Sequence, residues 1–183
     1  MRTAGKYRQR EFTAGRDCAR AALAQLGCPE QPILHDPNGV PIWPDGAMAA
    51  LSHSRGYCAA VAARQADFRM LGLDLEKTNR LSRAAITRVV HPQEQSYVVG
   101  DQRRASLIFS AKEAFFKAQF PEWQTHANFH DLELALEGGD SGRILIQNME
   151  QRFPDQLRAL ATDIQLRFCY FGDFVLTLCW LER

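Results

Sequence analysis

The spacing of apolar and polar residues along the chain predicts helices in both of its halves. Helices are expected over four ranges: residues 14–26, 81–90, 92–99 and 105–120. The first range (AGRDCARAALAQL) is rich in helix-forming residues, and Gly27 follows it as a stop signal. Pro92 is suited to open the third helix, and Pro121 is expected to end the fourth.

Elsewhere in the chain apolar and polar residues alternate, and this period of two predicts strands. Strands are expected over six ranges: residues 56–63, 69–77, 129–136, 143–147, 166–171 and 174–181. Residues 31–46 are dense in Pro, Gly, Asp and Asn, which predicts loops and turns. Because strands and helices do not alternate regularly, the pattern favours an α+β fold with antiparallel pairs over a parallel sheet.

Composition limits the possible functions. The 183 residues include 22 Lys and Arg against 21 Asp and Glu, a net charge of +1 that argues against a nucleic-acid-binding protein. No apolar stretch reaches the ~20 residues that a membrane helix needs. The 5 cysteines are odd in number and form no Cys-x-x-Cys pair, which favours reduced thiols and a cytoplasmic protein.

Two carboxylates are expected on one face of a strand. Asp74 and Glu76 are two residues apart, so their side chains point to the same side. Carboxylates this close repel each other unless a positive group lies between them, and Mg²⁺ is a natural partner. The alternative is a strand end whose polar face is simply solvated.

The predicted helix over residues 105–120 is apolar nearly all round, which is typical of a buried helix, yet it carries three charges. Lys112, Glu113 and Lys117 therefore need partners or a wet functional cleft. The alternative is a local surface ion pair between Glu113 and Lys117, which are four residues apart. Such a pair stabilises a helix by only ~0.3–0.5 kcal/mol.

Two further groups could bind phosphate. Ser52 and His53 lie in a predicted Ser-His-Ser turn that offers hydroxyl, imidazole and backbone donors. Arg16 and Arg20 are four apart on one helix face and could make bidentate contacts. Taken alone, these residues would form an ordinary polar turn and a solvated helix face.

Taken together, these motifs resemble the 4′-phosphopantetheinyl transferase superfamily. Its two-part acidic signature is matched by GLDLE at residues 72–76 and FSAKEAFFK at residues 109–117. AGRDCAR (residues 14–20), GVPIWPDG (39–46) and LSH (51–53) follow the order and spacing of its monomeric branch, typified by the enterobactin-synthetase enzyme.

The resemblance implies an enzyme that transfers phosphopantetheine from coenzyme A to a serine of an apo acyl or peptidyl carrier protein. It implies two similar lobes in a pseudo-twofold arrangement, each an antiparallel sheet on a helix, here residues 1–66 and 67–183, with coenzyme A in the cleft between them. Family members usually have a further segment ahead of the Arg16 motif, so the first lobe is expected to lack its opening strand or a covering piece.

The resemblance also implies roles for single residues. Mg²⁺ would be bound by Asp74, Glu76 and Glu113. Coenzyme A phosphates would be held by Arg16, Arg20, Ser52, His53 and Lys117. Glu113, directly or through a metal-bound water, would remove the serine proton, and Lys117 would neutralise charge on the pyrophosphate or the leaving phosphate. The expected protein is a cytoplasmic monomer without nucleic-acid or membrane partners.

Two other readings remain open. A homologue that binds carrier protein or coenzyme A with weak or no catalysis would keep the same motifs. A Mg²⁺-dependent nuclease is less consistent, because Lys77 follows Glu76 immediately instead of two residues later, and the net charge is poor for DNA.

Overall fold

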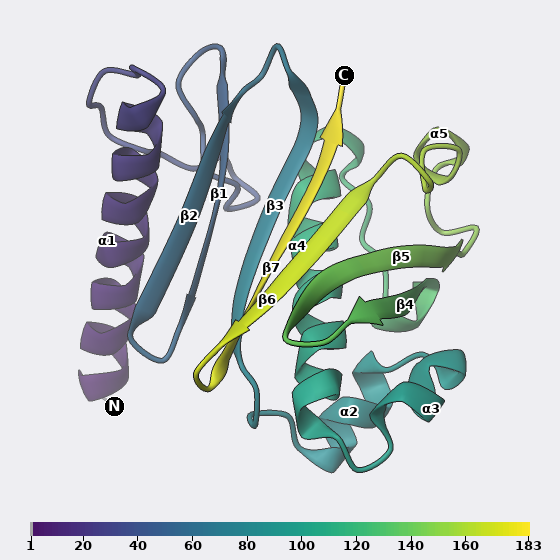
Figure 1. Cartoon of the computed structure of the whole chain (residues 1–183). Helices are drawn as coiled ribbons and strands as arrows, with labels where there is room; N and C mark the ends of the chain where they lie inside the picture. Colours follow the sequence, from purple (N-terminus) through teal and green to yellow (C-terminus); the bar gives the residue numbers. More distant parts are fainter. Residues whose placement is uncertain (1) are drawn as a thin grey trace.

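Two antiparallel sheets lie between two long helices (Figure 1). The computed structural model describes the backbone of residues 2–183 and the side chains of residue 5 and residues 9–183. Its helices are α1 (Arg2–Gln25), α2 (Arg83–Val89), η1 (Pro92–Glu94), α3 (Gln95–Val98), α4 (Gln102–Trp123), η2 (Phe129–Asp131) and α5 (Asp155–Arg158). Its strands are β1 (Ala47–Ser54), β2 (Tyr57–Arg64), β3 (Phe68–Lys77), β4 (Leu132–Gly138), β5 (Ser141–Met149), β6 (Gln165–Phe171) and β7 (Phe174–Glu182).

The first sheet is the hairpin β1-β2, packed on α1. Small residues let the helix approach the strands closely: Ala19 of α1 is fully buried, and a Cβ at Gly15 would lie 3.2 Å from Leu51 of β1. Leu23 and Ile33 complete this small core. The α+β prediction with an antiparallel sheet on a helix is confirmed for this part of the chain.

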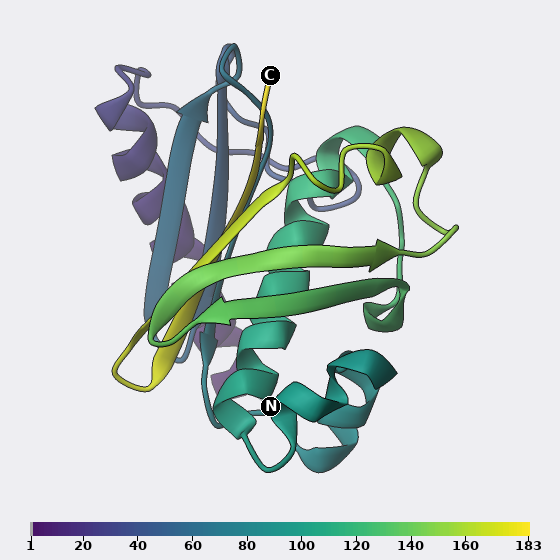
Figure 2. The same cartoon turned by 45° about the vertical axis from the view of Figure 1, so that its right-hand side comes forward.

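The second sheet has the order β3-β7-β6-β5-β4, and α4 packs against it (Figures 1 and 2). Its neighbouring strands are all antiparallel. Met70, Phe115, Leu132 and Phe153 are among the buried residues of the main core. This half of the chain also confirms the α+β prediction.

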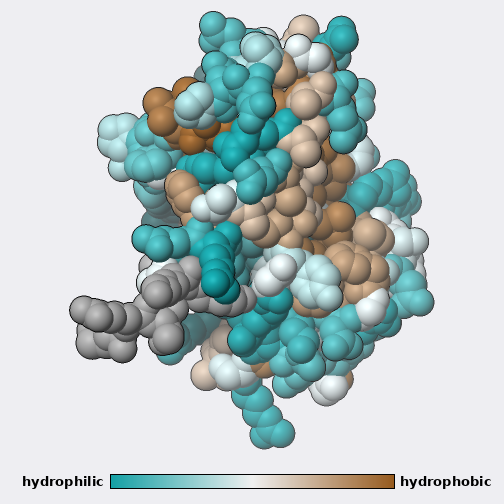
Figure 3. Space-filling view, turned by 90° about the vertical axis from the view of Figure 1, so that its left-hand side faces the viewer, coloured by the Kyte–Doolittle hydropathy of each residue, from teal (hydrophilic) through white to brown (hydrophobic). Residues whose placement is uncertain are grey.

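The two sheets meet where β1 runs beside β3. We call this contact the seam; Ala50 and Ala63 of the first sheet pack there against Leu71 and Leu73 of β3. Further apolar side chains on the same cluster are only partly buried, and the face of the molecule that carries α1 shows hydrophobic surface beside its polar area (Figure 3).

Several local predictions were wrong. β1 was not expected, and Ser52 and His53 lie in this strand and not in a turn. The predicted strand over residues 129–136 begins only at Leu132, because η2 occupies its start. Pro121 does not end α4, which continues to Trp123 and stops where Gln124 adopts a left-handed conformation with φ 48°. Pro121 lies in the last turn of α4, where its missing N–H removes only one backbone hydrogen bond. The loss is small enough for the helix to continue for two more residues.

A buried ion pair anchors α4 on its far side from the seam. Lys112 Nζ lies 2.8 Å from Glu94 Oε2, and both side chains are fully buried. Burial lowers the pKa of the Lys112 ammonium, and Glu94 opposes that shift. The remaining hydrogen bonds of this pair go to backbone groups of Val89, His91, Phe129 and Leu134. The pair therefore ties α4 to the segment around η1 and to β4.

We expect Lys112→Met to destabilise the protein by about 3–5 kcal/mol, because it leaves the Glu94 carboxylate buried without a countercharge. Arg104→Met is the matched control on the same helix, since Arg104 and its partner Asp101 keep 57% and 43% of their side chains exposed. Urea unfolding measures both variants; equal losses would contradict a special role for the buried pair.

We expect Gly72→Ala to destabilise the protein by roughly 1–3 kcal/mol or more, because the seam strand and α4 leave no room for a side chain. A Cβ at Gly72 would lie 2.7 Å from Ala118 N and would overlap Ala114 O. Gly139→Ala is the control, because nothing lies within 4 Å of its Cβ position. Urea midpoints compare the two, and similar midpoints would show that α4 moves aside easily.

Candidate active site

Asp74 joins three elements at the seam. β3 buries this carboxylate to 5% exposure, and its Oδ1 accepts hydrogen bonds from Ser52 Oγ of β1 at 2.9 Å and from Lys117 Nζ of α4 at 2.7 Å. Its other oxygen, Oδ2, is buried and has no hydrogen-bond partner. A buried carboxylate oxygen without a donor is costly, and it offers a coordination position to a cation.

Glu76 is held in a parallel manner two residues further along β3. Its Oε1 accepts hydrogen bonds from Ser54 Oγ at 3.1 Å and from the backbone N–H of Lys77 at 2.7 Å. Arg80 forms an ion pair with its Oε2 at 2.9 Å. Ser52 and Ser54 of β1 thus each contact one acid of β3.

α4 brings the third acid to the same place. Glu113 and Lys117 lie one helical turn apart, as predicted, and line a cavity of about 260 Å³ between β1, β3 and α4. The cavity is lined by Leu51, Ser52, His53, Asp74, Leu75, Glu76, Phe109, Glu113 and Lys117. Six of the predicted site residues are therefore brought together.

Burial raises the pKa of the Glu113 carboxyl, and the negative charge of Asp74 and Glu76 raises it further, against a smaller opposing effect of Lys117. The three acids therefore act on one another electrostatically. Among the residues that the structure describes, no group of three Asp, Glu, His or Cys side chains is already arranged around a metal position. Lys117 and Arg80 are the cations that contact the acids instead.

The residues of this cavity fit a hard divalent cation. The unpartnered Oδ2 of Asp74 can accept one, and the mutual repulsion of Asp74, Glu76 and Glu113 would be relieved by it. Carboxylates are the ligands that Mg²⁺ prefers, with the remaining positions taken by water or phosphate oxygens. The identity of the metal ligands stays a prediction.

The predicted phosphate-binding residues are divided between two places. His53 lines the acid cavity, with its Nδ1 3.7 Å from Glu11 of α1. Arg16 donates to the carbonyl of Ile33 at 3.0 Å, and both burial and the nearby charge of Arg20 lower its pKa. Arg20 pairs with Asp17.

Arg20 lines a separate cavity of about 310 Å³ beside Ile33. The two arginines therefore do not line the acid cavity, and their role as phosphate contacts stays a prediction.

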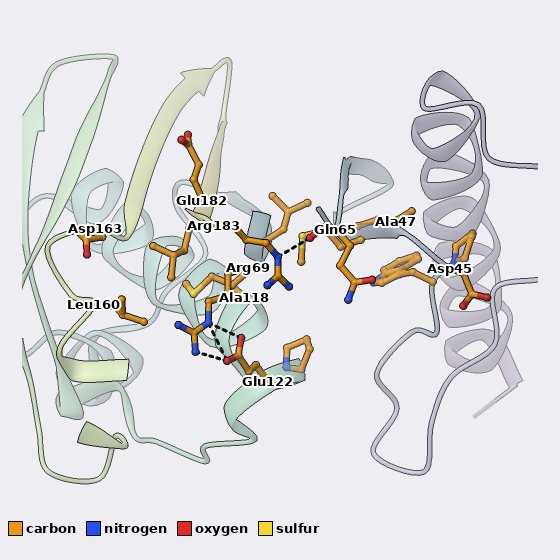
Figure 4. Close-up of a pocket in the computed structure, with 18 residues that line it drawn as sticks. Asp45, Ala47, Gln65, Arg69, Ala118, Glu122, Leu160, Asp163, Glu182 and Arg183 are labelled. Carbon is orange, nitrogen blue, oxygen red and sulfur yellow. Dashed lines mark hydrogen bonds and ion pairs between the residues drawn. The ribbon is translucent and has the colours of Figure 1, made fainter. Parts of the chain in front are cut away.

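A larger cavity of about 1030 Å³ follows the acid cavity along the seam. It lies between the start of β1, the start of β3 and the end of α4, with Met48, Met70 and Leu71 among its apolar residues. Figure 4 shows the charged side chains at its edge, including the ion pair of Arg69 with Glu122 at 2.6 Å. The seam thus carries two cavities, and the acids line the smaller one.

Sequence reasoning missed two residues of the acid site. Ser54 could have been found, because it follows Ser52 by two residues and a strand would place both hydroxyls on one face. That inference required β1, which was not predicted. Arg80 comes from the segment after β3, and no sequence pattern indicates that it folds back onto Glu76.

We expect Glu113→Gln to make the folded protein more stable than wild type at pH 8, with the gain shrinking toward pH 4. The folded-state pKa of Glu113 is raised above its unfolded value, so wild-type stability falls as pH rises through the interval between the two values. Glutamine does not titrate, so the variant lacks this loss of stability with rising pH. Urea unfolding at several pH values measures the difference; a gain that is constant with pH would contradict the assignment.

Comparisons with known proteins identify the family of the chain. A family model described as the 4′-phosphopantetheinyl transferase N-terminal domain matches residues 1–63, and one described as the 4′-phosphopantetheinyl transferase superfamily matches residues 70–179. The chain is similar to the 4′-phosphopantetheinyl transferase Svp of Streptomyces mobaraensis, at 37% identity over 76% of this chain and 60% of that protein. It is also similar to enterobactin synthase component D of Salmonella typhi, at 31% identity over 81% of this chain and 59% of that protein.

Among solved structures, a holo-ACP-synthase from Plasmodium yoelii matches 63% of this chain and 94% of its own, with a TM-score of 0.46 and 16% identity. The chain spans about three fifths of the length of the curated relatives it matches. No described helix is long and apolar enough to cross a bilayer. The second family model alone covers more than half of the residues and includes all three acids of the site, so the chain belongs to the 4′-phosphopantetheinyl transferase superfamily, in the branch that includes enterobactin synthase component D.

Proposed function

We propose that this protein transfers 4′-phosphopantetheine from coenzyme A to a serine of an apo acyl or peptidyl carrier protein in a Mg²⁺-dependent reaction. The observation that carries the proposal is the acid cavity at the seam, where Asp74, Glu76, Glu113 and Lys117 meet. In the transfer, the serine oxygen forms a bond to the β-phosphorus of coenzyme A, and the bond from that phosphorus to the adenosine bisphosphate leaving group breaks.

Asp74, Glu76 and Glu113 would hold Mg²⁺. When bound, the ion would supply neutralisation of charge on the pyrophosphate. The chain's own cations would continue this neutralisation: Lys117 lies 2.7 Å from Asp74 and can turn toward a phosphate oxygen, because its side chain is partly exposed. In the transfer of a phosphoryl-type group, the protein contributes mainly such positioning and charge stabilisation.

Glu113 is the proposed base for the serine proton. Its raised pKa makes the ionised carboxylate a stronger base than an exposed glutamate, closer to the value that suits proton transfer near neutral pH. Ser52 and Ser54 would act as positioning residues, because each donates to one of the acids on β3.

Arg16, Arg20, Ser52 and His53 are proposed to hold the phosphates of coenzyme A. His53 is the best placed of the three basic residues, since it lines the acid cavity itself. The arginines would reach a ligand that extends from this cavity across the face of α1. We further propose that residues 1–66 and 67–183 act as two lobes of a cytoplasmic monomer. Its free cysteines are consistent with that compartment.

The direct test mixes the protein with Mg²⁺, coenzyme A and a panel of apo carrier proteins from fatty acid, polyketide, peptide and siderophore synthesis. We expect one carrier or more to gain the mass of a phosphopantetheine, and chelation of Mg²⁺ to stop the gain. Binding of carrier and coenzyme A without any mass gain would instead support a catalytically inactive homologue.

We expect Glu113→Gln to lower the transfer rate by about 10²–10⁴-fold, the usual contribution of a general base. Asp74→Asn should lower the apparent affinity for Mg²⁺ as well as the rate. Arg143→Ala is the control, because Arg143 pairs with Glu137 on the second sheet, away from the seam, and should leave the rate unchanged. Wild-type rates in both acid variants would refute the assignment of these residues.

A further inference from the structure

Arg80 forms an ion pair with Glu76, one of the acids that line the acid cavity. Its Nη1 donates to Glu76 Oε2 at 2.9 Å and to Glu76 Oε1 at 3.2 Å. The Arg80 side chain is 52% exposed, whereas the Glu76 carboxylate is almost fully buried. The pair therefore joins a fixed carboxylate to a guanidinium that can turn into solvent.

The backbone that carries Arg80 is held on both sides. On one side the carbonyl of Asp173, in the turn between β6 and β7, accepts hydrogen bonds from Thr78 N at 2.9 Å and from Thr78 Oγ1 at 3.1 Å. On the other side Ser82 caps the first turn of α2 with its hydroxyl. Movement of Arg80 away from its carboxylate therefore needs a side-chain rotation and no rearrangement of the segment after β3.

The two carboxylates of β3 differ in how many of their oxygens are occupied. Glu76 Oε1 accepts hydrogen bonds from Ser54, from the backbone N–H of Lys77 and from Arg80, and Glu76 Oε2 accepts from Arg80. On Asp74, Oδ2 is buried and has no partner. When Arg80 turns away, Glu76 Oε2 loses this donor, and each acid of β3 can then offer one oxygen to a cation.

We propose that Arg80 competes with Mg²⁺ for Glu76 and thereby lowers the affinity of the acid site for the ion, an inference that rests on the Mg²⁺-dependent function proposed above. A guanidinium on a carboxylate occupies the oxygens that a metal ligand uses, and its positive charge repels a divalent cation. Arg80 must therefore turn toward solvent before Glu76 can act as a ligand. Breaking an exposed ion pair and relieving this repulsion correspond to a factor of about 3–10 in affinity.

Lys117, the other cation at the acids, differs from Arg80 in this respect. Lys117 bonds to Oδ1 of Asp74 and leaves Oδ2 of that carboxylate free. Its ammonium also donates to Ser52 Oγ at 3.1 Å, so it keeps an acceptor when a cation binds the free oxygen. Within the described residues, the side-chain hydrogen bonds of Arg80 all go to Glu76. Arg80 is therefore the cation whose position decides whether Glu76 can bind a metal ion.

Calorimetric titration of Mg²⁺ into the full chain measures the competition without coenzyme A or a carrier protein. We expect Arg80→Gln to bind Mg²⁺ about 3–10-fold more tightly than wild type. Arg80→Lys, which keeps the charge but loses the planar fork, should have an affinity between the two. Arg83→Gln is the matched control, because it removes the same charge from an exposed position at the start of α2, and its Mg²⁺ affinity should equal that of wild type.

Thermal unfolding gives a second readout, because a cation that binds the folded protein raises its Tm. A given rise in Tm should need about 3–10-fold less Mg²⁺ in Arg80→Gln than in wild type. Equal or weaker Mg²⁺ binding in Arg80→Gln, or an equal gain in Arg83→Gln, would overturn the proposal, and so would a failure of both wild type and Arg80→Gln to bind the ion.

The carrier-protein assay tests the proposed function separately from this competition. A wild-type protein that adds phosphopantetheine to a carrier, together with unchanged Mg²⁺ affinity in Arg80→Gln, would reject the competition and leave the transferase function standing. Tighter Mg²⁺ binding in Arg80→Gln without any transfer by wild type would support the competition and count against the transferase function.

Discussion

The hydrogen bonds to Asp74 are the contact on which the rest of the site depends. One carboxylate oxygen receives a hydroxyl from β1 and an ammonium from α4, while its own strand is the edge of the second sheet. Three elements from distant parts of the chain are thereby fixed at one atom. The apolar seam brings β1 and β3 together, but hydrophobic packing has little directionality, so the directional contacts between the two strands are the hydrogen bonds of Ser52 to Asp74 and of Ser54 to Glu76.

Two lysines on α4 have different roles, one structural and one at a cavity wall. Lys112 points away from the seam and is fully enclosed with Glu94, where every partner is fixed. Lys117 is more than a third exposed and bonds to Asp74 at the wall of a cavity. A buried, fully paired charge cannot take a new ligand without leaving its partner unpaired, whereas a charge at a cavity wall can exchange one oxygen for another.

The sequence was sufficient for those features that depend on local periodicity. The i and i+2 spacing of Asp74 and Glu76, and the i and i+4 spacing of Glu113 and Lys117, put each pair on one face, and the structure joins both pairs at one cavity. β1 was missed because AMAALSHS combines residues common in helices with polar ones, and its strand form is imposed by pairing with β2. The contact of Arg80 with Glu76 depends on how the segment after β3 folds back, for which a single sequence carries no periodic signal.

The acid site combines two opposed demands. Asp74, Glu76 and Glu113 repel one another, and Lys117 and Arg80, which are both partly exposed, neutralise part of this repulsion by pairing with Asp74 and Glu76. Under the proposed function, Mg²⁺ would neutralise the three acids, which would free Lys117 and Arg80 to bind phosphate oxygens. Under the proposed function, the residues that balance charge within the fold would thus be the same ones that bind the ligand, and they lie on a short stretch of β3, on one turn of α4 and just after β3.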